Sequence, residues 1–168
     1  LSSETMLKIY NNNNLILDLL NSNKILELED EDNNNLLMIM LKNRVNFKYI
    51  LKLVNMKIFN LNHTNKYFRN VLFYATYDLI TFKFLIDSGA STNLIDINNE
   101  NLIFDLCRNN NDIILKYLLL NQNMNINLKN NQFYTPIYYA KNISTIKLLI
   151  DFGSYKYIMD ITGKTFLN

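Results

Sequence analysis

A short block of similar sequence recurs along the chain and limits what the chain can fold into. In each copy a polar stretch leads through Asn or Thr into a few apolar residues. The four clearest copies begin at Asp30, Asp96, Asn130 and Asp160, and a weaker one begins at Asn65. The steps between them are 35, 31, 34 and 30 residues, with a mean of 32.5. A period of this size is typical of proteins built from stacked supersecondary units, so each unit should pack mainly against its neighbours.

Each unit is predicted to contain two helices. After the first short helix and a polar break, apolar residues recur at helical spacing, as in the segment 113–119. Gly89, Gly153 and Asn23 stand where such a second helix would end in a left-handed residue. Pro136 occupies a first helical position, where its missing N–H costs least. The residues predicted to cap the first helices with a side-chain oxygen are Asn35, Asn70, Asn101, Thr135 and Thr165.

Composition excludes several classes of protein. With 168 residues and 49% hydrophobic side chains the chain can bury a core. The single Cys107 excludes an internal disulfide framework and indicates a reducing compartment, so we expect an intracellular, cytoplasmic protein. One His and one Cys cannot form a zinc site, and we expect no metal and no cofactor. The net charge of +2 gives no reason to expect a nucleic-acid partner, and no apolar run is long enough for membrane insertion.

Asparagine is unusually frequent, at 31 of the 168 residues. Ile, Lys, Tyr and Phe are also common, and all of these residues have AT-rich codons, so base composition is the simplest explanation. A prion-like tract is the alternative, but the Asn runs are short and lie between apolar blocks. On the repeat register much of the asparagine falls at predicted caps, turns and tips, where Asn can replace Gly, Asp or Thr at modest cost.

Two segments give the repeat a resemblance to a known family. The segment 135–140, Thr-Pro-Ile-Tyr-Tyr-Ala, resembles the Thr-Pro-Leu-His-x-Ala signature of ankyrin repeats. The segment 85–93, Leu-Ile-Asp-Ser-Gly-Ala-Ser-Thr-Asn, is similar to that family's Leu-Leu-x-x-Gly-Ala-x-x-Asn. The sequence departs from the family at the His position, which is held by Met38, Phe73, Phe104, Tyr138 and Asn168. We expect Phe73, Phe104 and Tyr138 to lie in the core instead.

The resemblance implies an all-α ankyrin-repeat solenoid, a right-handed stack of helix–turn–helix units with hairpin-like tips. We expect one domain over 1–168 with about five repeats, counting partial ends. Because the ends are incomplete units, we interpret the chain as a segment of a longer protein. The expected units are 1–29, 30–64, 65–95, 96–129, 130–159 and a partial 160–168.

No catalytic apparatus is visible, so we expect a protein that is not an enzyme. His63 is interpreted as a solvated loop residue, without the second His or nearby Cys that hydrolytic or zinc chemistry needs. Cys107 is interpreted as a buried, packed thiol. The acidic run 27–32 does not have the spacing of a calcium loop and is interpreted as a solvated tip.

The resemblance implies that a concave groove and the tips of the repeats bind a partner protein of unknown identity, with no small-molecule substrate. Aromatic side chains beside charged ones have the composition of interface hot spots, although an AT-rich sequence would also scatter aromatics. The alternatives are a regulatory or targeting segment of a larger enzyme or membrane protein, and an architectural spacer. The residues predicted to bind the partner are Tyr74, Ile95, Ile97, Glu100, Asp105, Arg108, Lys129, Gln132, Phe133 and Tyr139.

Overall fold

A computed structural model describes residues 29–155 of the chain. Within this range the regular structure consists of seven α-helices and one 3₁₀ helix, with one isolated bridge between Glu29 and Asn35 and no strand. The expectation of an all-α fold is confirmed for these residues. None of the described helices is long and apolar enough to cross a membrane.

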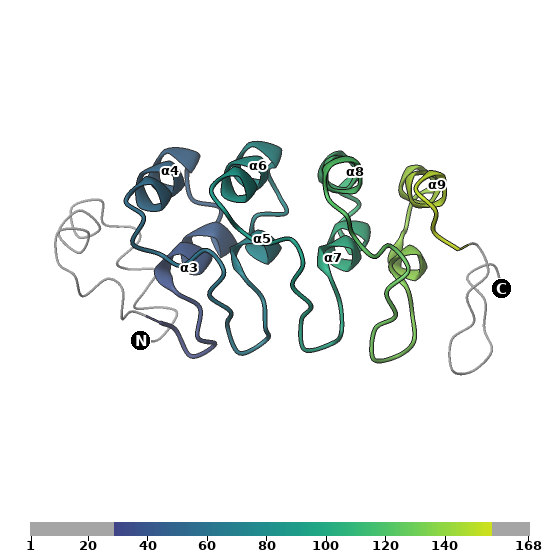
Figure 1. Cartoon of the computed structure of the whole chain (residues 1–168), viewed down its shortest axis with the longest axis horizontal. Helices are drawn as coiled ribbons and strands as arrows, with labels where there is room; N and C mark the ends of the chain where they lie inside the picture. The colour runs from purple at the N-terminus through teal and green to yellow at the C-terminus, as the bar shows by residue number, and fades with distance from the viewer. Residues whose placement is uncertain (1–28, 156–168) are drawn as a thin grey trace.

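The helices form two layers that run side by side along the molecule (Figure 1). Each helix of the first layer is followed in the chain by its partner in the second layer. The first layer contains α3 (Leu36–Lys42), α5 (Val71–Tyr74), α7 (Leu102–Arg108) and the 3₁₀ helix η2 (Pro136–Tyr139). The second layer contains α4 (Phe47–Asn55), α6 (Leu79–Asp87), α8 (Asp112–Asn121) and α9 (Ile143–Asp151).

Successive pairs pack against each other, and long loops project below the first layer (Figure 1). We refer to the four described pairs as the first to fourth units, which open at Asp30, Asn65, Asp96 and Asn130. One continuous apolar core lies between the layers and crosses every unit boundary in this part of the chain. Its largest fully buried side chains include Phe82, Leu36 and Leu72. Because each unit buries its flanks against its neighbours, the core extends along the row instead of forming a sphere.

The predicted caps of the first helices are confirmed in three of the four described units. The side chains of Asn35, Asn70 and Asn101 accept hydrogen bonds from backbone N–H groups in the first turns of α3, α5 and α7. The prediction for Thr135 is wrong. The N–H of Tyr138 donates instead to the backbone oxygen of Thr135, closing a 3₁₀ turn, and the Thr135 hydroxyl is buried without a hydrogen bond. Thr165 lies outside the described residues.

Left-handed residues end helices where the sequence predicts them. Gly89 and Gly153 have φ of 104° and 93°. Their N–H groups donate to the backbone carbonyl oxygens of Ile86 and Ile150, which lie in the last turns of α6 and α9. Such closing bonds satisfy carbonyl groups that a helix end otherwise leaves free. The matching prediction for Asn23 falls outside the described residues.

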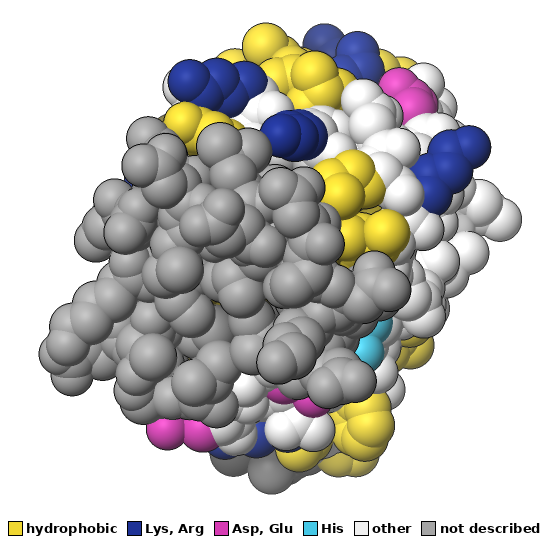
Figure 2. All heavy atoms as spheres, turned by 90° about the vertical axis from the view of Figure 1, so that its left-hand side faces the viewer, with side chains coloured by type: hydrophobic (Ala, Val, Ile, Leu, Met, Phe, Trp, Pro, Cys, Tyr) yellow, Lys and Arg dark blue, Asp and Glu magenta, His cyan; other side chains and the backbone are white. Residues whose placement is uncertain are grey.

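The outer surface of the second layer carries apolar and basic side chains next to each other (Figure 2, top). Ile80, Ile113 and Ile143 are exposed near the starts of α6, α8 and α9. Lys83 and Lys116 are exposed one turn further along α6 and α8. Single exposed apolar residues are normal on protein surfaces, so this outer surface serves below as the reference for tests of the opposite one.

Candidate binding surface

Four turns of the same geometry hang below the first layer (Figure 1). In each turn the Oδ1 atom of the opening residue accepts hydrogen bonds from the backbone N–H groups two and four residues later. All eight N···O distances lie between 2.8 and 3.1 Å. The opening residues are Asp30, Asn65, Asp96 and Asn130. The block at Asn65, the weakest of these in sequence, therefore has the same turn as the others.

Hydrogen bonds between backbones join each turn to the next. The N–H groups of Lys66, Ile97 and Asn131 donate to the carbonyl oxygens of Asp32, Tyr67 and Asn98, each at 3.0 Å. These donors occupy the same place in three successive turns, and so do the acceptors. The turns therefore form a regular ladder, which holds their exposed side chains at fixed positions.

A row of buried polar side chains runs behind the turns. The amide of Asn65 donates to Asn34 at 2.7 Å and to the Tyr74 hydroxyl at 2.6 Å. In the fourth unit, Asn130 makes the equivalent bonds to Glu100 at 2.8 Å and to the Tyr139 hydroxyl at 2.9 Å. Buried polar groups that are fully hydrogen bonded make an arrangement specific and rigid. Tyr74 and Tyr139 are therefore fixed by the turns.

An ion network occupies the centre of this row. Arg69 donates through Nε and Nη2 to Asp96, at 3.0 and 2.6 Å, and its Nη1 lies 3.3 Å from Asp105. Arg108 pairs with Glu100 and lies 3.2 Å from Asp105. The Arg108 guanidinium also sits 4.2 Å from the ring centroid of Tyr139. These contacts connect the second, third and fourth units.

Burial and charge shift the ionisation of this network. Burial raises the pKa of Asp105 above the ordinary carboxyl value, and the positive charges of Arg69 and Arg108 offset only part of that shift. Burial alone would lower the pKa of Arg108, but the hydrogen bond and charge of Glu100 outweigh it and raise the pKa. The Asp96 side chain is fully buried, and Arg69 supplies its countercharge. The network is thus held together by pairing, since an unpaired charge at this depth would be costly.

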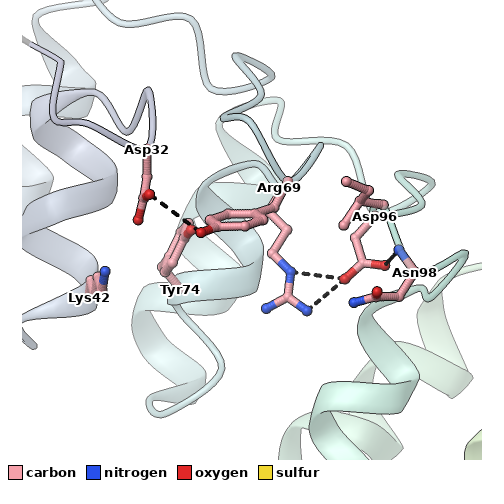
Figure 3. Close-up of a pocket in the computed structure, with 8 residues that line it drawn as sticks. Asp32, Lys42, Arg69, Tyr74, Asp96 and Asn98 are labelled. Atoms are coloured by element: carbon pink, nitrogen blue, oxygen red, sulfur yellow. Dashed lines mark hydrogen bonds and ion pairs between the residues drawn. The ribbon is translucent and has the colours of Figure 1, made fainter.

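A pocket of about 280 Å³ opens beside the network, between the turns of the first three units (Figure 3). Its wall combines the aromatic and apolar side chains of Tyr67, Tyr74 and Ile97 with charged ones. Of these charged groups, Asp32 pairs with Lys66. Arg69 points at Asp96 (Figure 3). The pocket is large enough for one side chain of a partner and offers both apolar and polar contacts.

The structure brings six of the ten predicted residues together. Tyr74 and Ile97 line the pocket. Glu100, Asp105, Arg108 and Tyr139 belong to the adjoining ion network. Lys129, Gln132 and Phe133 are exposed on the third-to-fourth connection and the fourth turn. Ile95 instead lines a separate hollow of about 200 Å³ with Asn101 and Leu128.

Glu100 and Tyr138 require corrections. Glu100 was expected at an exposed tip, but it is buried because its carboxylate accepts hydrogen bonds from Arg108 and Asn130. Tyr138 was expected in the core, but it is 40% exposed. Its ring stacks on Tyr134 with centroids 3.9 Å apart. The 3₁₀ geometry of η2 places successive side chains about 120° apart, unlike the α-helices of the other units. Phe73 and Phe104 are buried as expected.

The sequence prediction missed four residues of this surface: Lys42, Tyr67, Phe68 and Arg69. A signal for three of them was present in the repeat itself. Aligning the weak block at Asn65 with the block at Asn130 places Tyr67 and Phe68 opposite Gln132 and Phe133, which were predicted. The same alignment places Arg69 opposite Tyr134. No sequence signal distinguishes Lys42, which reaches the pocket only through the packing of α3.

The other candidate residues behave differently from one another. His63 is not simply solvated: its Nε2 lies 2.9 Å from the Asn33 carbonyl oxygen and 3.4 Å from Glu29. Cys107 is buried as predicted, and burial raises the pKa of its thiol to about 12. Within the acidic run, Asp30 is buried and bonded to Asn34, which corrects the expectation of a solvated tip there. Residues 29–155 contain no cluster of His, Cys, Asp and Glu that could hold a metal ion.

In comparisons with known proteins, no protein-family model and no curated protein matches the chain.

Proposed function

We propose that the chain is an ankyrin-repeat array and a non-catalytic module that recognises a partner protein. The binding surface would be the turn face, which we define as the four turns, the pocket beside them and the exposed side chains of the first layer. The observation that carries the proposal is the ladder of four equivalent turns at 30, 65, 96 and 130. It repeats at the spacing of the ankyrin signature and displays exposed apolar residues.

The physics of the turn face suits recognition. The backbone bonds between turns and the buried polar row fix the side chains before any partner arrives, so binding would spend little free energy on ordering them. Tyr67 and Ile97 stand exposed at the pocket mouth. Aromatic and apolar anchors beside a pocket are where binding energy concentrates in protein interfaces.

Affinity capture from the native host, followed by mass spectrometry, tests this proposal. The test variant carries Lys42→Glu and Ile97→Asp, two exposed changes on the turn face. The matched control carries Lys116→Glu and Ile113→Asp on the outer surface of α8, where Ile113 is 69% exposed. We expect the test variant to lose partners that the wild type and the control retain, with circular dichroism showing equal helix content. If the test variant keeps the same partners, the proposal fails and an architectural spacer becomes the better interpretation.

A further inference from the structure

Two of the four turns carry a residue that does not suit its backbone conformation. The residue three places after each opening residue is left-handed: Asn33, Phe68, Asn99 and Phe133 have φ of 61°, 60°, 62° and 67°. Asn visits this region comparatively easily, because its short polar side chain can hydrogen-bond locally. Phe has no such compensation. The first and third turns therefore use a residue that favours the turn, and the second and fourth do not.

Burial does not explain the two phenylalanines. Their side chains are 56% and 51% exposed, at Phe68 and Phe133 respectively. The base composition of the sequence does not explain them either, because asparagine is three times as frequent as phenylalanine in this chain, at 31 residues against 10. A residue that strains the backbone and also exposes an aromatic ring is most readily understood as a contact with another molecule.

The charges of the same face indicate the character of that molecule. Asp32, Asp96, Glu100 and Asp105 are each paired with a Lys or Arg of the chain. Lys42 lines the pocket, and Lys129 directly precedes the fourth turn. Neither of these two lysines forms an ion pair within the part of the chain that the structure describes. Lys42 acts on the already paired Asp32 only through its charge, without an ion pair, so acidic groups of another molecule would complement both lysines.

The spacing of the turns indicates the shape of the bound molecule. Phe68 and Phe133 belong to the second and fourth turns, and the exposed Ile97 lies on the turn between them. Packed helices lie about 8–10 Å apart, so two units separate the phenylalanines by about 16–20 Å. An extended chain rises about 3.3 Å per residue and covers this distance in about five or six residues.

We propose that the turns bind an extended acidic segment of a partner protein, with two apolar side chains about six residues apart that contact Phe68 and Phe133. Acidic side chains of the segment would lie near Lys42 and Lys129, and a residue between the two anchors would reach Ile97. This inference rests on the proposed function and specifies the class of partner.

A displayed library of random twelve-residue peptides, selected on the full chain, tests the inference. We expect enriched peptides to be acidic and to carry two apolar residues at the stated separation. The affinity of one enriched peptide is then measured by fluorescence anisotropy for the wild type and for Phe68→Asn/Phe133→Asn. Asn already occupies the equivalent sites in the other two turns, so the double variant should melt at a higher temperature than the wild type and still bind at least tenfold more weakly.

Enrichment of basic peptides, absence of any enrichment, or unchanged affinity in the double variant would each overturn the inference. The proposed function is tested separately by the capture experiment with Lys42→Glu/Ile97→Asp. Partners lost in that experiment, together with unchanged peptide binding by Phe68→Asn/Phe133→Asn, would retain recognition by the turn face and remove only the two phenylalanine contacts.

Discussion

At the scale of the residue, asparagine side chains supply most of the helix caps and several of the bonds between units. Asparagine caps six of the eight described helices, at positions 35, 46, 70, 101, 111 and 142. It also bridges units. Asn62 donates to the Gly89 carbonyl oxygen and accepts from the Ser91 N–H, while Asn127 makes the same two contacts to Gly153 and Tyr155. An amide can donate through its nitrogen and accept through its oxygen at once, whereas an ionised Asp can only accept.

Asn101→Ala should be more destabilising than Asn46→Ala. Asn101 accepts from the Ile103 N–H and also donates to the carbonyl oxygen of Asn125, in the segment that follows α8 of the same unit. Asn46 only accepts from Lys48 at an exposed position. We expect a loss of about 2 kcal/mol for Asn101→Ala and about 1 kcal/mol for Asn46→Ala. Urea denaturation measures both values, and equal losses would show that the bridging bond adds nothing.

Thr135→Val should stabilise the fourth unit. The Thr135 hydroxyl is buried without a hydrogen bond, whereas the equally buried Thr145 donates to Asp112. Replacing an unsatisfied hydroxyl with a methyl group of similar size should raise the free energy of unfolding by about 1 kcal/mol. Thr145→Val is the control and should lower it. Thermal melting of both variants measures these changes. A destabilised Thr135→Val protein would mean that the Thr135 hydroxyl of the wild type is hydrogen bonded in solution.

At the scale of the element, the sequence predicts helices better than it predicts their surfaces. The caps at Asn35, Asn70 and Asn101 and the ends at Gly89 and Gly153 depend on local backbone chemistry, so the pattern was sufficient to place them. Glu100 was placed at an exposed tip because it occupies a polar stretch, but it is buried against Arg108 of α7 and Asn130 of the next unit, 30 residues along the chain. Contacts between units decide exposure, and no local pattern contains them.

Helix α7 should make stability depend on pH through Asp105. Burial raises the pKa of this carboxyl in the folded chain above its ordinary value of 3.8. The folded state then binds the proton more tightly than the unfolded state. The resulting stabilisation is complete below the ordinary pKa and is lost as pH rises through the raised one.

Asp105→Asn isolates this contribution. We expect the free energy of unfolding of the wild type, relative to the variant, to decrease as pH rises from about 3.8 through the mildly acidic range. Urea denaturation at a series of pH values gives the difference, in which the other carboxyl groups largely cancel. A difference that stays constant or increases with pH would mean that the arginines outweigh burial and that the pKa of Asp105 is not raised.

At the scale of the whole molecule, stability should depend on the bonds between neighbouring units, because a row of units has no central core to share. Arg69 is the main polar link between the second and third units. It leaves the second turn and binds the fully buried Asp96 of the third turn as well as Asp105 of α7. Lys66 links the second unit to the first through Asp32, but this pair is largely exposed. The two links differ in burial and should therefore differ in strength.

Arg69→Ala should uncouple the array between its second and third units. Removing one partner of a buried pair leaves Asp96 charged and unpaired, which typically costs about 3 kcal/mol or more. Lys66→Ala should cost much less than Arg69→Ala, because an exposed pair contributes little. Hydrogen exchange followed by mass spectrometry reports where each cost falls. For Arg69→Ala we expect α5 and α7, next to the broken link, to exchange faster than in the wild type. Helix α9 should exchange at the wild-type rate. A uniform increase across all four units would show that the molecule unfolds as a single cooperative body, in which the position of a link does not matter.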